Sequence, residues 1–300
     1  MTIITLNNIA KSYKEKKVLT NVNININKGD ILGYIGENGT GKTTTIKIIS
    51  GINNPDSGTV LFPNNTSKIS VVFDFNGLYE DMTAYENLLF FCKLSDIDPS
   101  LYVSKIKEYL NIVNLYNEKD IVVKKFSKGM KRRLALARAI ITEPNILILD
   151  EPFDGIDVKN HYFFVEFLKK WVLTSNRCVL VTSHNMHEIE NLCNKVCFLE
   201  NGQITKYSTL NSLIDENSDC IRIKLDKSED INRVISIFKK HNLTILNQTA
   251  DNCIEIQHNN TESNKKIINI LIESNILFTE ISEKKYNLEE IYMKKVTKND

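Results

Sequence analysis

A glycine-rich loop near the start of the chain has the residue types needed to hold phosphates. It follows the apolar run from 31 to 35, which reads as a buried strand, and it matches the pattern GxxxxGK[ST]. Glycines let successive backbone N–H groups curve around phosphates, and a helix starting after the loop adds a positive end. The candidate phosphate-binding residues are Gly36, Glu37, Asn38, Gly39, Thr40, Gly41, Lys42, Thr43 and Thr44.

Two acidic residues end a second apolar strand and narrow the range of reactions that a phosphate-binding loop could serve. Asp150 and Glu151 directly follow the run from 146 to 149. A carboxylate at such a strand end usually holds Mg²⁺ beside a phosphate loop, directly or through water. Asp150 and Thr43 are therefore the candidate metal ligands, while Lys42 would reach the β- and γ-phosphates. Glu151 lies where an attacking water needs a general base, with a helix-proximal salt bridge as its alternative role.

Between these motifs lies a segment that resembles a known family. Residues 126 to 139 read FSKGMKRRLALARA, similar to the signature motif of ABC ATPases, which commonly reads LSGGQ. The residues that match the family pattern are Ser127, Gly129 and Arg133, and those that depart from it are Phe126, Lys128 and Met130. The variant form resembles one in drug- and peptide-exporter subunits, of the bacteriocin type. The resemblance implies an ATP-hydrolysing subunit with a P-loop NTPase fold.

The start of this segment has its own physical reading. Ser127 is a good N-cap, which leaves a hydroxyl and free N–H groups at a positive helix end. In the family this end contacts ATP held by the opposite subunit, so Ser127, Lys128 and Gly129 are expected to complete the partner's site in a head-to-tail dimer. An ordinary basic amphipathic helix is the alternative reading of the segment.

The resemblance extends to three further positions. Tyr13 resembles the aromatic residue that stacks on adenine. Asp157, in the loop from 154, resembles the carboxylate of the loop that carries information across the dimer. His184 follows the strand-like run from 179 to 183, where the family has a switch histidine for the γ-phosphate. A competing metal site of His184, His187, Cys193 and Cys197 has no familiar zinc-ligand spacing.

One position departs from the family in a way that bears on the metal. Where the family usually has a glutamine, alignment on the run from 69 to 73 puts Asp74. A carboxylate can ligate Mg²⁺ but lacks the amide donor, so Asp74 is a third candidate metal ligand. A shifted register would make Asn76 the relevant amide instead.

The surrounding patterns predict an α/β core. Alternation from 22 to 27 favours a half-exposed strand, and apolar runs at 60–62, 69–73, 146–149 and 178–182 favour further strands. Thr83 and Glu86 form a capping box before a helix, and Asn201-Gly202 forms a hairpin turn. We expect a nucleotide-binding domain over 1–215, with antiparallel β and helical subdomains, the latter at about 76–142.

The last third of the chain has a different pattern. From 216 to 300 we expect a small accessory α+β domain with the order β-α-β-β-α-β, which is ferredoxin-like. It has no glycine-rich loop or cluster of acids, so packing or dimer support and small-ligand sensing both stay open. Its final segment, 288–293, resembles the closing helix of export-type subunits.

Composition limits the partners. The 300 residues carry a net charge of +1, which gives no electrostatic reason to expect nucleic acid. Six cysteines in mostly apolar segments suit buried, reduced thiols, and no apolar run is long enough to span a bilayer. We therefore expect ATP and Mg²⁺ as ligands, a homodimer or heterodimer, and a membrane-spanning permease at the cytoplasmic face of the membrane, without direct membrane insertion. The alternative is a soluble ABC ATPase acting on ribosomes or chromosomes. Ribosome-acting members usually carry two nucleotide sites in one chain and chromosome-acting members a long coiled coil, and this sequence has neither feature.

Overall fold

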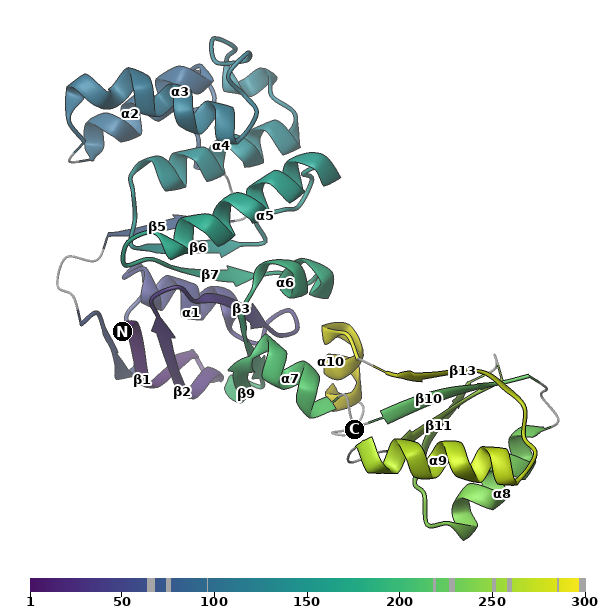
Figure 1. Ribbon diagram of the computed structural model, residues 1–300. Helices are drawn as coiled ribbons and strands as arrows, with labels where there is room; N and C mark the ends of the chain where they lie inside the picture. Colours follow the sequence, from purple (N-terminus) through teal and green to yellow (C-terminus); the bar gives the residue numbers. More distant parts are fainter. Residues whose placement is uncertain are drawn as a thin grey trace. The chain divides into compact units, whose positions relative to one another are not determined.

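The chain divides into two compact units, Met1–Leu210 and Asn211–Asp300 (Figure 1). The structure, a computed structural model, describes residues 1–63, 68–73, 77–95, 97–217, 220–226, 230–249, 252–257, 261–284 and 286–296. The predicted domain boundary, between 215 and 216, falls inside helix α7 (Leu210–Asn217).

A mostly parallel sheet forms the centre of the first unit. Its strand order is β5-β6-β7-β3-β8-β9, and only β9 runs antiparallel to its neighbour. The strands are β3 (Ile31–Ile35), β5 (Ile69–Val72), β6 (Ile146–Asp150), β7 (Cys178–Thr182), β8 (Lys195–Glu200) and β9 (Gln203–Thr209). Every residue of β3, β6 and β7 is buried, as expected for strands covered on both faces. The carboxyl ends of these three adjacent strands therefore meet at one edge of the sheet.

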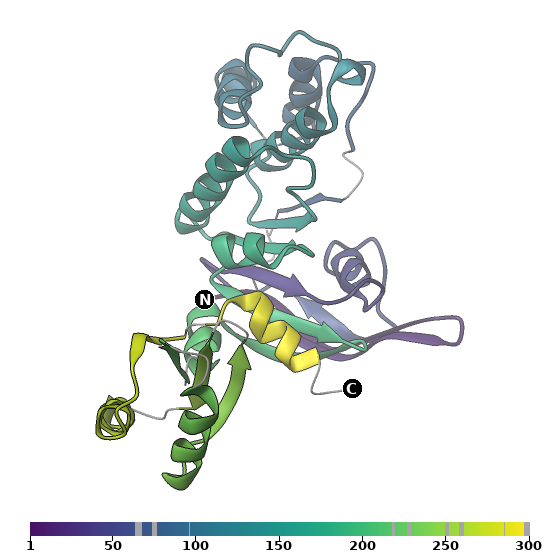
Figure 2. The same cartoon turned by 90° about the vertical axis from the view of Figure 1, so that its right-hand side faces the viewer.

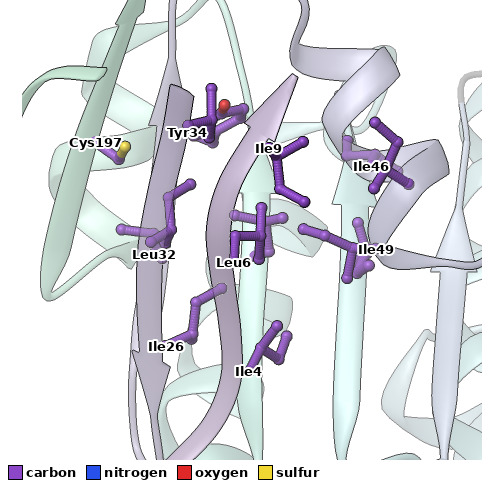
Figure 3. Packing of buried hydrophobic residues seen from close by; sticks show 14 of the residues in the cluster. Ile4, Leu6, Ile9, Ile26, Leu32, Tyr34, Ile46, Ile49 and Cys197 are labelled. Carbon is purple, nitrogen blue, oxygen red and sulfur yellow. The ribbon is translucent and has the colours of Figure 1, made fainter. Parts of the chain in front are cut away.

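A second, antiparallel sheet shares a hydrophobic core with the first. Its strand order is β2-β1-β4, with β1 (Thr2–Tyr13), β2 (Lys16–Asn27) and β4 (Ser57–Leu61). Helix α1 (Lys42–Ile49) buries Ile46 and Ile49 against Leu6 and Ile9 of β1, in the same core as Leu32 of β3 (Figure 3). The core thus anchors the helix that begins at the phosphate loop.

Strand β1 was not predicted. Its burial does not alternate strictly, because its pairing with β2 shifts register at several points, one of them between Leu6 and Ile9. Asn8 within that shift has φ of 51°, in the left-handed region. A bulged strand of this kind interrupts the two-residue period on which the sequence prediction depends.

Three helices form a group at the end of the unit opposite the antiparallel sheet, with the parallel sheet between them (Figure 2). They are α2 (Ala84–Leu94), α3 (Tyr102–Ile112) and α4 (Lys128–Ile141), with short 3-10 turns at Pro99–Leu101 and Val123–Lys125. The predicted capping box is confirmed, since the Thr83 hydroxyl accepts from the Glu86 amide and the Glu86 carboxylate accepts from the Thr83 amide. Helices α5 (Val158–Leu173) and α6 (Met186–Leu192) follow β6 and β7.

The second unit has the predicted element order β-α-β-β-α-β. Its elements are β10 (Cys220–Leu225), α8 (Asp230–Lys240), β11 (Ile245–Thr249), β12 (Cys253–Gln257), α9 (Thr261–Glu273), β13 (Phe278–Glu283) and then α10 (Leu288–Val296). The sheet order is β11-β12-β10-β13 with every pair antiparallel. Apolar side chains from β10 and β12 and from both helices, including Phe238 and Leu271, form a separate core. The second unit therefore has a hydrophobic core of its own, as an independently stable domain requires.

Two predictions from composition can be compared with the structure. All six cysteines are buried and none is in a disulfide, as predicted. In the described parts of the chain, no helix combines the length and the apolar character needed to cross a membrane.

Candidate active site

The glycine-rich loop joins the buried strand β3 to helix α1. Gly41 is the N-cap of α1 and has φ of 113°, a conformation that L side chains rarely adopt. A Cβ at Gly36 would collide with the carbonyl oxygen of Leu199, so both positions need glycine. Glu37, Asn38 and Gly39 are exposed at the tip of the loop. The loop backbone therefore lies open to solvent at the positive end of a helix whose apolar face is fixed in the core.

Lys42 turns back into the loop that precedes it. Its ammonium group donates to the carbonyl oxygen of Gly36 and, at 3.0 Å, to that of Glu37. Burial lowers the pKa of Lys42, and the nearby charges of Glu151 and Asp150 oppose that shift. The lysine is thus held by neutral acceptors, close to two carboxylates.

The loop and the end of β6 meet through Thr43 and Asp150. The Thr43 hydroxyl lies 3.5 Å from Oδ2 of Asp150, although 107 residues separate the two in sequence. Asp150 is only 8% exposed, and the Thr182 hydroxyl at the end of β7 donates to its Oδ1 at 2.5 Å. A hydroxyl and a carboxylate are the oxygen ligands that Mg²⁺ prefers, so this pair fits that ion.

Glu151 and His184 lie together beside this pair. Nδ1 of His184 is 2.9 Å from Oε2 of Glu151, and the His184 amide donates to the same oxygen at 3.3 Å. His184 is largely exposed, whereas the Glu151 side chain is 26% exposed. The Glu151 amide donates to the carbonyl oxygen of Thr182 at 3.1 Å. The two predicted catalytic side chains therefore contact each other at the open edge of the sheet.

The predicted signature segment packs on the loop that follows Glu151. Ser127 is the N-cap of α4 and accepts from the Met130 amide at 3.2 Å, as predicted. Lys128 donates to Asp154 at 2.6 Å, which lowers the pKa of that carboxyl. A Cβ on Gly129 would lie 2.5 Å from the carbonyl oxygen of Gly155, so the two backbones are in close contact.

Comparison with known proteins agrees with this geometry. The model of the family described as ABC transporter matches residues 19–154. Bacitracin transport ATP-binding protein BcrA of Bacillus licheniformis is 31% identical over 306 residues, covering 98% of this chain and 97% of the relative. Nod factor export ATP-binding protein I of Burkholderia lata is 32% identical over 249 residues, covering 79% of this chain and 82% of the relative.

This chain belongs to the ABC transporter family. The predicted family resemblance and ABC-type ATPase fold are confirmed. A solved ATP-binding subunit of an ABC transporter shares the fold, with a TM-score of 0.67 over 72% of this chain and 93% of that one, at 24% identity. A dimeric ATP-binding cassette in a post-hydrolysis state, bound to ADP and Pi, is 26% identical, with a TM-score of 0.62 over 69% of this chain and 99% of that one.

The structure also describes three other predicted residues of this ABC ATPase. Asp157 is the N-cap of α5, and hydrogen bonds from Asn160 lower the pKa of its carboxyl. Tyr13 ends β1, is 45% exposed, and accepts from the Asn53 side chain at 2.8 Å. Thr44 is half-buried in the first turn of α1. None of these contacts assigns a ligand to the residue, so their roles stay predictions.

The sequence raised two metal-related hypotheses, Asp74 as a ligand and a competing site of histidines and cysteines. Asp74 and the alternative Asn76 both lie outside the described residues. In the competing site, the two cysteines that would join His184 and His187, namely Cys193 and Cys197, are buried. In the parts of the chain that the structure describes, no three His, Cys, Asp or Glu side chains converge as metal ligands.

Sequence reasoning missed one residue that touches the site. Arg132 of α4 is 3% exposed, and its guanidinium donates to the backbone carbonyl oxygens of Asp150, Glu151 and Pro152. The sequence interpretation named the neighbouring Arg133, which instead donates to Val113 and Asn114 at 2.8 Å. A charged residue on the apolar face of α4 was the available signal.

Proposed function

We propose that this ABC ATPase powers export of a peptide, drug or other amphiphile through a separate membrane-spanning permease. The observation that carries the proposal is the meeting of Thr43 and Asp150, because it brings the phosphate loop and the acidic pair to one place. The named role of one relative, Nod factor export, supports an export direction, and that of the other, bacitracin transport, supports a transport role.

The residues of this chain divide the chemistry among them. The loop amides and Lys42 would hold the phosphates, and Thr43 and Asp150 would hold Mg²⁺, which supplies charge neutralisation at the γ-phosphate. Glu151 would orient and deprotonate the attacking water, since its carboxylate lies at the edge where β6 ends. His184 would contact the γ-phosphate while its Nδ1 stays close to Glu151. Each group would act by position and charge rather than by covalent chemistry.

A second ATPase subunit would complete each site. Ser127, Lys128 and Gly129 begin α4, where unsatisfied N–H groups and the helix dipole favour an anion. Two copies of this chain, or one copy and a related subunit, would each offer this helix start to the nucleotide of the other. The dimeric form of a solved cassette 26% identical to this chain supports such an arrangement.

The permease would place the ATPase at the cytoplasmic face of the membrane. Co-purification from detergent-solubilised membranes separates this proposal from its rival. A stable partner with several membrane spans supports transport, whereas a ribosomal or chromosomal partner supports the alternative of a soluble ABC ATPase.

The Glu151→Gln variant tests the proposed chemistry. It keeps the shape of the side chain but removes the base, so ATP hydrolysis should fall at least about a hundredfold while ATP binding persists. Size-exclusion chromatography with ATP and Mg²⁺ should then detect a trapped dimer. Hydrolysis at the rate of the unmodified protein would remove Glu151 from its role.

A further inference from the structure

Arg132 binds two separate segments of the first unit with one side chain, the end of β5 and the residues from Asp150 to Pro152. Its guanidinium donates to the carbonyl oxygen of Phe73 after β5 at 2.6 Å, of Asp150 at 2.5 Å and of Pro152 at 3.0 Å. It also donates to the carbonyl oxygen of Glu151. These four acceptors belong to the backbone, and Arg132 itself comes from the signature helix α4. The helix and the residues after the metal-binding strand are therefore joined by this one side chain.

The backbone at Glu151 needs such support. Its φ of 49° is in the left-handed region, which is unfavourable for an L-residue. A conformation of this kind persists only where surrounding contacts fix it. The Glu151 amide is held by the carbonyl oxygen of Thr182 and its carbonyl oxygen is held by Arg132. Because φ sets the direction of the side chain, these two contacts also aim the carboxylate.

We propose that Arg132 is a positioning residue for Glu151, which it holds in the left-handed conformation that aims the carboxylate toward the attacking water. The inference rests on the proposed role of Glu151 as general base. The Arg132 side chain would then link helix α4 to the base. The first residues of α4 are those that would meet the partner's nucleotide. A shift of α4 would move the guanidinium and, with it, the backbone of Glu151.

Arginine suits this task better than other cations. Its planar guanidinium presents five N–H donors in a fixed geometry and stays charged even when buried. A lysine ammonium is a compact point charge and cannot match four acceptors from two segments in the same way. Arg132→Lys therefore keeps the charge and part of the bonding, which makes it the informative substitution.

Another arginine of the same helix provides a matched control. Arg138 also lies in α4 and donates to a backbone carbonyl oxygen, that of Val71 in β5, at 2.9 Å. Its guanidinium stacks over the ring of Phe91, 5.1 Å from the centroid. None of its described contacts involves the residues from Asp150 to Pro152. Arg138→Lys should therefore reproduce the packing cost of Arg132→Lys without its effect on the base.

The experiment is a double-mutant cycle on steady-state and single-turnover ATP hydrolysis. Arg132→Lys should lower kcat about tenfold to a hundredfold, because a small displacement of a reacting group has an effect of that size. The KM for ATP should stay within about twofold of the unmodified value, since the phosphate loop is untouched. Arg138→Lys should leave kcat within about twofold.

The decisive arm combines Arg132→Lys with Glu151→Gln. If Arg132 acts through the base, adding Arg132→Lys to the Glu151→Gln variant should lower the residual hydrolysis rate of that variant by less than about twofold. The reason is that the two residues then act as one unit. Equal factors in both backgrounds would mean that Arg132 only supports the fold, and an unchanged kcat in Arg132→Lys would also overturn the inference. A fully active Glu151→Gln variant would instead overturn the proposed function. Arg132→Gln, with thermal melting, tests whether loss of the charge unfolds the protein while Arg132→Lys remains folded.

Discussion

The two units each contain a buried carboxylate near a lysine, but they use the pair differently. In the second unit, Glu255 is 2% exposed and accepts from Lys284 at 2.7 Å and from the Tyr286 hydroxyl at 3.3 Å. In the first unit, Asp150 is 8% exposed and accepts from two threonine hydroxyls. Lys42 donates to loop carbonyl oxygens instead.

The difference lies in which group satisfies each charge. Glu255 and Lys284 neutralise one another, so little of their charge remains for a ligand. In the described residues around the phosphate loop, no ion pair joins Lys42 to Asp150 or Glu151. Neutral partners hold the charges apart, which leaves the lysine available for phosphates and the carboxylate available for a metal. A buried acid beside a lysine therefore indicates a functional site only where the two are not already paired.

The largest contrast is expected when each carboxylate is made neutral. Asp150→Asn should lower ATP turnover by about a hundredfold or more, because it removes a charge from the proposed Mg²⁺ site. Glu255→Gln should leave turnover within about twofold, since it lies in the other unit. Phosphate release measured across a Mg²⁺ titration checks both variants. Equal losses in the two variants would contradict the assignment of the metal site to the first unit.

Removal of each lysine should separate binding from stability. Lys42→Ala should weaken ATP binding about tenfold to a hundredfold, the value of a hydrogen bond to a charged group. Lys284→Ala should leave ATP affinity unchanged but destabilise the second unit by about 3 kcal/mol, because the Glu255 charge loses its partner. Calorimetric titration with ATP measures the first effect, and hydrogen exchange of β10 and β12 measures the second.

Lys224→Ala, an exposed position on β10, is the control for the second unit and should change its stability by less than about 0.5 kcal/mol. The only tryptophan, Trp171, lies in the first unit, so its fluorescence reports the unfolding of that unit alone.

Normal ATP affinity in Lys42→Ala would refute the role of this lysine in phosphate binding.

Acid should affect the second unit through Glu255. Burial raises the pKa of this carboxyl, but the hydrogen bond and charge of Lys284 outweigh burial, so the pKa lies below its usual value of 4.5. A carboxyl with a lowered folded-state pKa adds stability above its unfolded pKa, and this stability is lost as pH falls through the folded value. Urea unfolding of the second unit at several pH values below 5 should show this loss. Glu255→Gln should reduce the dependence, and an unchanged dependence would assign it to other carboxyls.

The sequence was most informative where chemistry requires a fixed local pattern. The loop from 36 to 43, the acids at 150 and 151 and the two N-caps depend on residue types at short spacing, and the structure has each at the expected element end. Strand β1 was missed because its bulges disrupt the two-residue period. The contact of Arg132 with the backbone after β6 joins residues about 20 positions apart through a fold that local patterns do not determine.

The smallest contrast compares two helix caps within the first unit. Thr83→Ala and Ser127→Ala each remove a side-chain cap, so each should cost about 1 kcal/mol of stability. Thr83 lies at the start of α2, away from the phosphate loop, and turnover should stay near that of the unmodified protein. Ser127 begins the helix proposed to meet the partner's nucleotide, so its loss should also lower the turnover of the dimer severalfold, by about the energy of one hydrogen bond. Melting temperatures and hydrolysis rates measured on the same two variants separate these effects. If both variants lose only stability, the start of α4 is a structural cap and not part of a shared site.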